Sequence, residues 1–134
     1  MKAKTLRLLL VGATGAVGQE VLKLGLADER ISAICAVTRR PLDAEKFPSN
    51  PKLENIIVDF SALPHRPVWC SVNAVICTLG TTIKVAGSRE AFAAIDLELP
   101  VTIARLAKEA GATRFGLNSS LGANALSPNF YLRT

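Results

Sequence analysis

The sequence predicts an α/β protein: a doubly wound parallel sheet of about five strands in the order 3-2-1-4-5, with helices on both faces in three layers. Two observations carry this prediction. Short apolar runs, each suited to a buried strand, alternate along the chain with segments of helical periodicity. A glycine-rich turn joins the first run to the first helical segment, and right-handed crossovers then favour a doubly wound sheet.

Length and composition fit one domain that covers residues 1–134. Of the 134 residues 49% are hydrophobic and 20% are charged, and the apolar runs are too short to cross a membrane. The start, MKAKTLRLLLVGATG, resembles a signal peptide, but its apolar run meets a glycine turn and then a charged amphipathic segment. We interpret it as a first strand and expect no membrane partner.

Charges and cysteines narrow the function classes further. The net charge is +5, but the cations are scattered along the chain. A phosphate-bearing small molecule explains them equally well, and we do not expect nucleic acid as a partner. Cys35, Cys70 and Cys77 form no CxxC pair and lie in or near apolar stretches, which indicates reduced thiols and a cytoplasmic location. His65 has no partner at ligand spacing, so no metal site is predicted.

The strands are predicted from their apolar runs. Residues 6–11 (LRLLLV) are nearly all apolar, as in a strand buried on both faces, and residues 15–27 follow with mostly helical spacing of apolar side chains. Four later runs rich in Val, Ile and Cys are predicted as strands at residues 33–38, 53–60, 74–79 and 114–119. The polar, proline-bearing residues 39–52 are interpreted as a surface connection.

A long helical stretch, residues 88–111, precedes the last strand. We divide it at Asp96, a plausible N-cap, so that Pro100 falls in a first helical turn, where its missing N–H has no helical partner. Gly111 is expected to end this helix.

The glycine turn GATGAVG indicates a nucleotide site. Gly12 permits a tight turn, Gly15 lets the backbone approach a pyrophosphate, and Gly18 allows close packing of helix and sheet. The predicted contacts with the dinucleotide come from the turn and the helix start: Gly12, Thr14, Gly15, Ala16, Val17 and Gly18. A purely structural turn is the alternative.

The end of the second strand favours NADP over NAD. An NAD site would place a carboxylate there for the ribose hydroxyls, whereas this sequence continues Thr38, Arg39, Arg40, with no carboxylate before Asp43. Guanidinium groups suit a 2′-phosphate, and Arg39 is the first choice, with Arg40 beside it. The alternative is that both arginines are solvated loop charges.

Several motifs together resemble the atypical short-chain dehydrogenase/reductases. The similar subgroup contains epimerase-like and NmrA-like NAD(P)-binding oxidoreductases related to a human Tat-interacting protein. The resemblance covers nearly the whole chain, and the motifs are GATGAVG at residues 12–18, VDF at 58–60, CTLGTT at 77–82, AKEAGATRF at 107–115 and SSLGA at 119–123.

The resemblance implies a Rossmann fold and further cofactor contacts. Asp59 and Phe60 would lie beside the adenine, and Leu79, Gly80 and Thr81 would line the cofactor. Each has a structural alternative: Phe60 as core, Asp59 as a turn cap, Gly80 as a residue needed only for chain geometry.

The resemblance also implies a catalytic serine, tyrosine and lysine. Tyr131 matches the acid or base that exchanges a proton with the substrate oxygen, and Ser120, or Ser119, matches the serine that holds this oxygen. The alternative for this closing stretch is a loop with an aromatic anchor. The family lysine would be residue 135, so we expect the chain to be an N-terminal portion without the substrate region and catalytically incomplete.

Two function classes follow from these expectations. The first is an NADP(H)-dependent oxidoreductase or epimerase that acts on an unknown carbonyl or alcohol substrate; the second is a non-catalytic NADP(H)-binding regulator or scaffold. The fifth strand would form an exposed apolar edge, which predicts self-association as a homo-oligomer.

Overall fold

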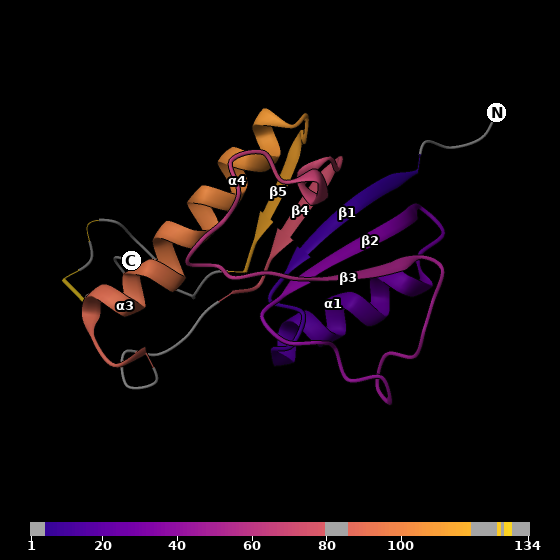
Figure 1. The fold of residues 1–134 in the computed structure, drawn as a ribbon, viewed down its shortest axis with the longest axis horizontal. Helices are drawn as coiled ribbons and strands as arrows, with labels where there is room; N and C mark the ends of the chain where they lie inside the picture. Colours follow the sequence, from indigo (N-terminus) through magenta and orange to yellow (C-terminus); the bar gives the residue numbers. More distant parts are fainter. Residues whose placement is uncertain (1–4, 80–85, 119–125, 127, 130–134) are drawn as a thin grey trace.

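The sheet has the predicted topology. The computed structural model describes residues 5–79, 86–118, 126 and 128–129. Five parallel strands pair in the order β3-β2-β1-β4-β5 (Figure 1). Their bounds are β1 Leu6–Val11, β2 Ile31–Thr38, β3 Leu53–Ile57, β4 Ala74–Cys77 and β5 Arg114–Leu117. The predicted fold class and strand order are confirmed.

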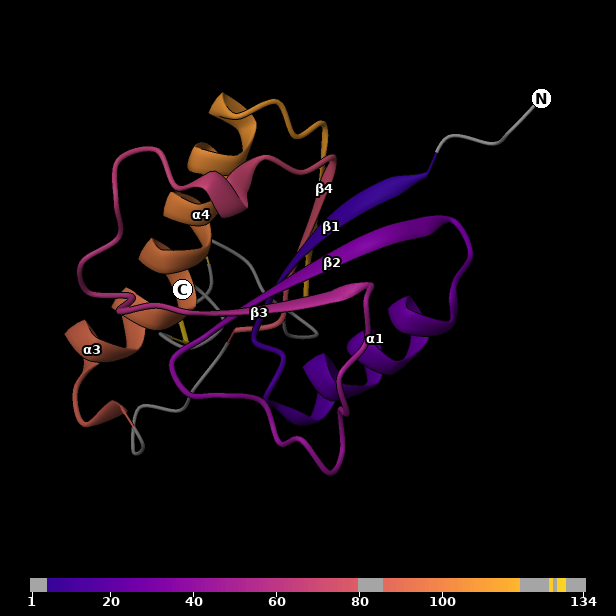
Figure 2. The same cartoon turned by 45° about the vertical axis from the view of Figure 1, so that its right-hand side comes forward.

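Helices cover both faces of this sheet. Helix α1 (Ala16–Ala27) lies on one face, and α3 (Arg89–Ala93) and α4 (Leu99–Glu109) lie on the other (Figure 2). A short 3₁₀ turn, Val68–Cys70, precedes β4. Within the described part of the chain, no helix is both long and apolar enough to span a membrane. The helices on the two faces of the sheet give the three-layer arrangement that the sequence predicts.

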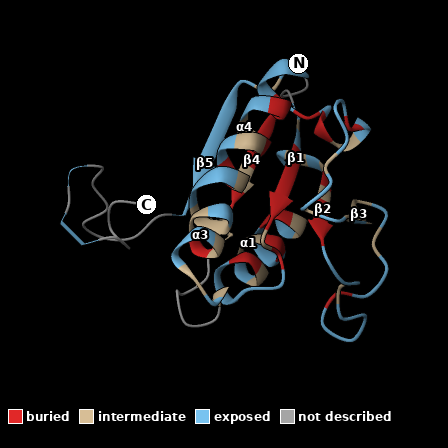
Figure 3. Ribbon diagram, turned by 60° about the vertical axis from the view of Figure 1, so that its left-hand side comes forward, coloured by how far each residue is buried: buried red, intermediate tan, exposed pale blue. Residues whose placement is uncertain are grey.

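The central strand β1 separates two apolar cores. Leu8 and Leu10 pack in a cluster with α1, while Leu9 and Val11 pack in a second cluster with α4. All four side chains are buried because parallel strands with helices on both faces have no solvent-facing side. Figure 3 shows this contrast between the buried centre and the more exposed periphery.

The predicted division at Asp96 is wrong. The chain stays helical from α3 to α4, and Asp96 lies within a π-helical turn, Ala94–Glu98, that joins them. The N-cap is instead Ser88, whose Oγ accepts a hydrogen bond from the Ala91 N–H at 3.0 Å. Pro100 removes one helical N–H and crowds the preceding turn, and a wider π turn relieves this conflict without ending the helix. Gly111 follows α4 with φ +109°, as expected of the residue that ends it.

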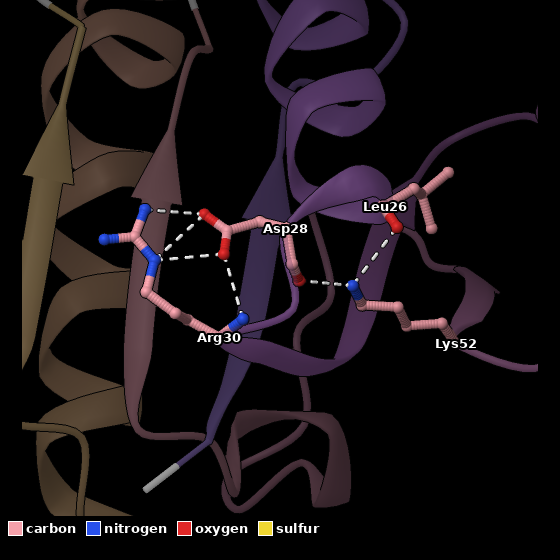
Figure 4. A network of polar contacts seen from close by, with 4 residues as sticks. All are labelled: Leu26, Asp28, Arg30 and Lys52. Carbon is pink, nitrogen blue, oxygen red and sulfur yellow. Dashed lines mark hydrogen bonds and ion pairs between the residues drawn. The ribbon is translucent and has the colours of Figure 1, made fainter. Parts of the chain in front are cut away.

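The connection between β2 and β3 has no helix of its own. It is largely exposed, as expected, but Phe47 is buried in the cluster beside α1. Lys52 anchors its other end: the ammonium donates hydrogen bonds to the carbonyl oxygens of Leu26 at 3.2 Å and Asp28 at 2.6 Å (Figure 4). Since these carbonyls close α1, the cation also opposes the negative end of the helix dipole.

Strand β5 forms one edge of the described sheet, next to β4. Phe115 is 40% exposed and Leu117 is 51% exposed, and all residues of the strand are exposed (Figure 3). A groove of about 430 Å³ runs between this strand and α4. Self-association through this edge stays a prediction.

We expect the Lys52→Ala substitution to lower the free energy of unfolding by about 1–2 kcal/mol, because it removes two charge-assisted hydrogen bonds at the end of α1. The matched control is Lys23→Ala, which removes only an exposed 3.3 Å pair with Glu20 and should cost less than about 0.5 kcal/mol. Urea unfolding followed by circular dichroism measures both. Equal losses in the two variants would contradict the anchoring role of Lys52.

Candidate functional site

The glycine turn lies where β1 and β4 end side by side, with Val11 paired to Cys77. Here the chain order of the strands reverses, and ligands of open α/β sheets bind beyond the carboxyl ends of strands at such a point. Thr78 joins the two ends: its N–H donates to the Val11 carbonyl at 2.8 Å, and its hydroxyl lies 3.0 Å from the Gly12 carbonyl. Thr78 is not among the residues predicted from the sequence, although a threonine directly after an apolar run is a usable signal.

Packing within the protein requires two of the three glycines. Gly12 has φ +95°, and a Cβ on it would lie 2.7 Å from the Thr78 carbonyl carbon and 2.8 Å from the Leu79 nitrogen. A Cβ on Gly18 would overlap the Gly12 carbonyl oxygen and reach 2.8 Å from the Thr78 hydroxyl. The tight turn and the close packing of helix on sheet are therefore both present in the structure.

Gly15 is different because no described residue requires it to be glycine. Its φ is −76°, which any residue can adopt, and the nearest described atom to an added Cβ would be the Gly12 carbonyl oxygen at an ordinary 3.6 Å. Thr14, Gly15, Ala16 and Val17 are all exposed. Among the described residues, none fills the space beside Gly15.

The start of α1 is also uncapped by the described residues. Gly15 is its N-cap, and no side chain in the described part of the chain caps the first N–H groups, which have no acceptor within the helix. Gln19 stabilises the turn, because its side-chain amide donates a hydrogen bond to the Thr14 carbonyl at 2.9 Å. Free N–H groups and the positive end of the helix dipole therefore point from a fixed turn toward the carboxyl edge of the sheet.

The two arginines follow β2 at the same edge of the sheet. Arg39 and Arg40 are exposed, and none of the ion pairs among the described residues includes either side chain. Val37 pairs with Val11, so β2 ends beside the strand that carries the glycine turn. Asp43, the first carboxylate after β2, accepts the Glu45 N–H at 2.9 Å and so caps its own turn.

The residues after β3 and β4 have clear structural roles. Asp59 accepts hydrogen bonds from the N–H and the hydroxyl of Ser61 at 2.9 and 2.6 Å, and these bonds lower the pKa of its carboxyl. Phe60 and Leu79 are partly buried and pack against the cluster beneath α4. The turn-cap and core alternatives account for Asp59 and Phe60, and contacts of these three with a cofactor stay predictions.

Five of the predicted site residues lie outside the described residues. They are Gly80 and Thr81 in the predicted cofactor site, and Ser119, Ser120 and Tyr131 in the predicted catalytic group.

The thiols form no second reactive site in the described region. Burial raises the pKa of Cys35 to about 12 and that of Cys70 to about 11, and it raises the pKa of Cys77 as well. The three are free thiols. Among the described residues, no group of three His, Cys, Asp or Glu side chains is arranged to hold a metal ion.

Comparison with known proteins identifies the family. A family described as NAD(P)H-binding matches residues 12–133. Protein FMP52, mitochondrial, of Meyerozyma guilliermondii is 35% identical over 136 aligned positions, which cover 96% of this chain and 55% of that protein. Protein HTATIP2 of Rattus norvegicus is 32% identical over 133 positions, covering 98% and 54%. The chain thus spans about half the length of these relatives.

Solved structures with low sequence identity share the fold. The Bordetella bronchiseptica enzyme WbmG in complex with NAD superimposes with a TM-score of 0.70 at 16% identity, over 96% of this chain and 43% of that one. UDP-glucuronic acid 4-epimerase from Bacillus cereus, also with NAD, gives 0.69 at 11% identity, over 87% and 40%. The chain belongs to the NAD(P)H-binding family, and it has the dinucleotide-binding Rossmann fold of the atypical short-chain dehydrogenase/reductases that its motifs predict.

Proposed function

We propose that this chain forms the NADP(H)-binding part of a short-chain-type oxidoreductase or epimerase that acts on a carbonyl or alcohol. The observation that carries the proposal is that no described residue requires a glycine at position 15. Protein packing accounts for Gly12 and Gly18, whereas no described residue fills the space beside Gly15 or caps the helix start next to it. A pyrophosphate needs such a close backbone approach with free N–H donors.

The preference for NADP(H) over NAD(H) rests on the end of β2. The position suited to a ribose-binding carboxylate is followed by Arg39 and Arg40, and Asp43 is engaged in its own turn. A guanidinium offers a planar fork of donors to a 2′-phosphate, and both side chains are exposed at the correct edge.

The proposed chemistry follows the family resemblance. Bound NADP(H) supplies hydride exchange with the substrate carbon. In this proposal Tyr131 exchanges a proton with the substrate oxygen, and Ser120, or Ser119, holds that oxygen by a hydrogen bond.

Two further predictions concern the cellular location and the oligomeric state of the protein. A cytoplasmic location and self-association through β5 stay predictions; the FMP52 relatives carry "mitochondrial" in their names, which makes fractionation the direct measurement of location.

The two kinds of glycine should separate folding from binding. We expect Gly18→Ala to lower the free energy of unfolding by about 3 kcal/mol or more, because its Cβ meets backbone. Gly15→Ala should cost less than about 1 kcal/mol yet weaken NADPH binding at least about tenfold, since the methyl group fills the space proposed for pyrophosphate. Urea unfolding and fluorescence titration measure the two quantities. Unchanged NADPH affinity in Gly15→Ala would refute the proposed pyrophosphate position.

The choice of dinucleotide should depend on Arg39. We expect the chain to bind NADPH more tightly than NADH, and Arg39→Ala to weaken NADPH binding about tenfold or more with little change for NADH, because one charge-assisted phosphate contact is lost. Arg30→Ala is the matched control: it removes the same charge from the amino end of β2, where Arg30 pairs with Asp28. Tighter binding of NADH by the unmodified chain would contradict the proposed preference.

Activity should separate the enzyme from the regulator. We expect the protein to oxidise NADPH in the presence of at least one member of a panel of aldehydes and ketones, and Tyr131→Phe to abolish this by removing the proton donor. Absorbance at the NADPH band and the melting temperature with NADPH are measured together. A rise in melting temperature with no turnover across the panel would favour the binding regulator.

A further inference from the structure

We propose that Asn55 and Thr38 are specificity-determining positioning residues: a relay of hydrogen bonds from β3 through these two side chains fixes the loop that presents Arg39 and Arg40 to the 2′-phosphate. This inference rests on the proposed NADP(H) function. In this inference Asn55 and Thr38 do not contact the phosphate themselves. They hold the backbone of Arg39 and Arg40, which do.

The Asn55 amide uses both of its ends. Its Nδ2 donates to the Ala36 carbonyl and to the Thr38 hydroxyl, each at 2.9 Å. Its Oδ1 accepts the Leu42 N–H at 2.9 Å. One side chain of β3 therefore binds the last residues of β2 and the far end of the loop, residues 39–42, at the same time.

The Thr38 hydroxyl continues the relay. It donates its proton to the Arg40 carbonyl at 2.6 Å and accepts from Asn55, so its single proton is already committed. Thr38 is 3% exposed, the only polar side chain among the buried core residues of the described chain. An unsatisfied hydroxyl at this depth would cost free energy, so Thr38 favours the one arrangement in which its hydroxyl bonds both Asn55 and the Arg40 carbonyl.

These bonds surround the two arginines. The Thr38 carbonyl accepts the Val58 N–H at 2.9 Å, the Arg40 carbonyl is held by the Thr38 hydroxyl, and the Leu42 N–H is held by Asn55. Pro41, between Arg40 and Leu42, has its own φ angle fixed by the proline ring. The backbone is therefore fixed before, at and after the arginines, while their side chains stay exposed.

A fixed loop lowers the cost of binding a phosphate. If the backbone were free, the ligand would have to order the loop as well as the side chains, and that lost entropy would subtract from the affinity. NADH lacks the 2′-phosphate, so its affinity does not depend on where the guanidinium groups lie. A positioning role therefore predicts a change in the ratio of the two affinities, whereas a merely structural role would weaken both cofactors alike.

The experiment measures dissociation constants for NADPH and NADH in the unmodified chain, in Asn55→Leu and in Thr38→Val. We expect about a tenfold rise in the NADPH constant for Asn55→Leu and a threefold to tenfold rise for Thr38→Val, with less than a twofold change for NADH. Thr38→Val keeps the shape of the side chain, so it tests the relay even if Asn55→Leu does not fold. Circular dichroism checks the fold of both.

Asn50→Ala is the matched control. Asn50 lies in the same connection, and its Oδ1 accepts the Lys52 N–H at 2.9 Å, but it lies at the amino end of β3, away from the arginines. Its substitution should leave the affinity ratio unchanged. If Asn55→Leu and Thr38→Val change both constants equally, or change neither, the inference is wrong while the proposed function stands. If the unmodified chain does not prefer NADPH, the proposed preference fails first and the inference fails with it.

Discussion

Helix α1 packs tightly on the ends of β1 and β4, and this contact sets the geometry of the glycine turn. At Gly18 the helix backbone lies directly on the Gly12 carbonyl, and the Thr78 hydroxyl donates a hydrogen bond to the same carbonyl at 3.0 Å. No side chain larger than hydrogen fits at Gly18 without moving backbone. This contact sets the direction in which the free N–H groups of α1 point, so the same packing that closes the core opens the dinucleotide site.

The two sides of the sheet are supported in different ways. On the α4 side a continuous helical segment with a π turn covers the strands, and Pro100 is accommodated by the change of helical pitch. On the α1 side, the connection from β2 to β3 has no helix, so a buried Phe47 and the hydrogen bonds of Lys52 and Asn55 hold an irregular segment in place. The loop with the paired arginines belongs to this irregular segment, which explains why its shape needs polar side chains rather than helical hydrogen bonds.

The site joins residues with separate duties. In the proposed site, Gly15 provides room, α1 provides donors, and the arginines provide charge, while Thr78, Thr38 and Asn55 hold the backbone that carries these groups. The distribution fits a site preorganised for anions, in which supporting hydrogen bonds reduce the ordering that a ligand must impose.

The fold class, the strand order, the glycine turn and the family follow from the amino-acid sequence, because apolar periodicity and glycine spacing are local patterns that parallel sheets require. The position of Arg39 and Arg40 after β2 follows for the same reason. Three features emerge only in the folded chain: Asp96 lies inside a helix, Asp43 is engaged in a turn, and Asn55 reaches across to Thr38 and Leu42. The first depends on how a helix adjusts to proline, and the others depend on hydrogen bonds that are chosen when segments pack. The partners of Asn55 are separated from it by as many as 19 residues, and no local pattern records that distance.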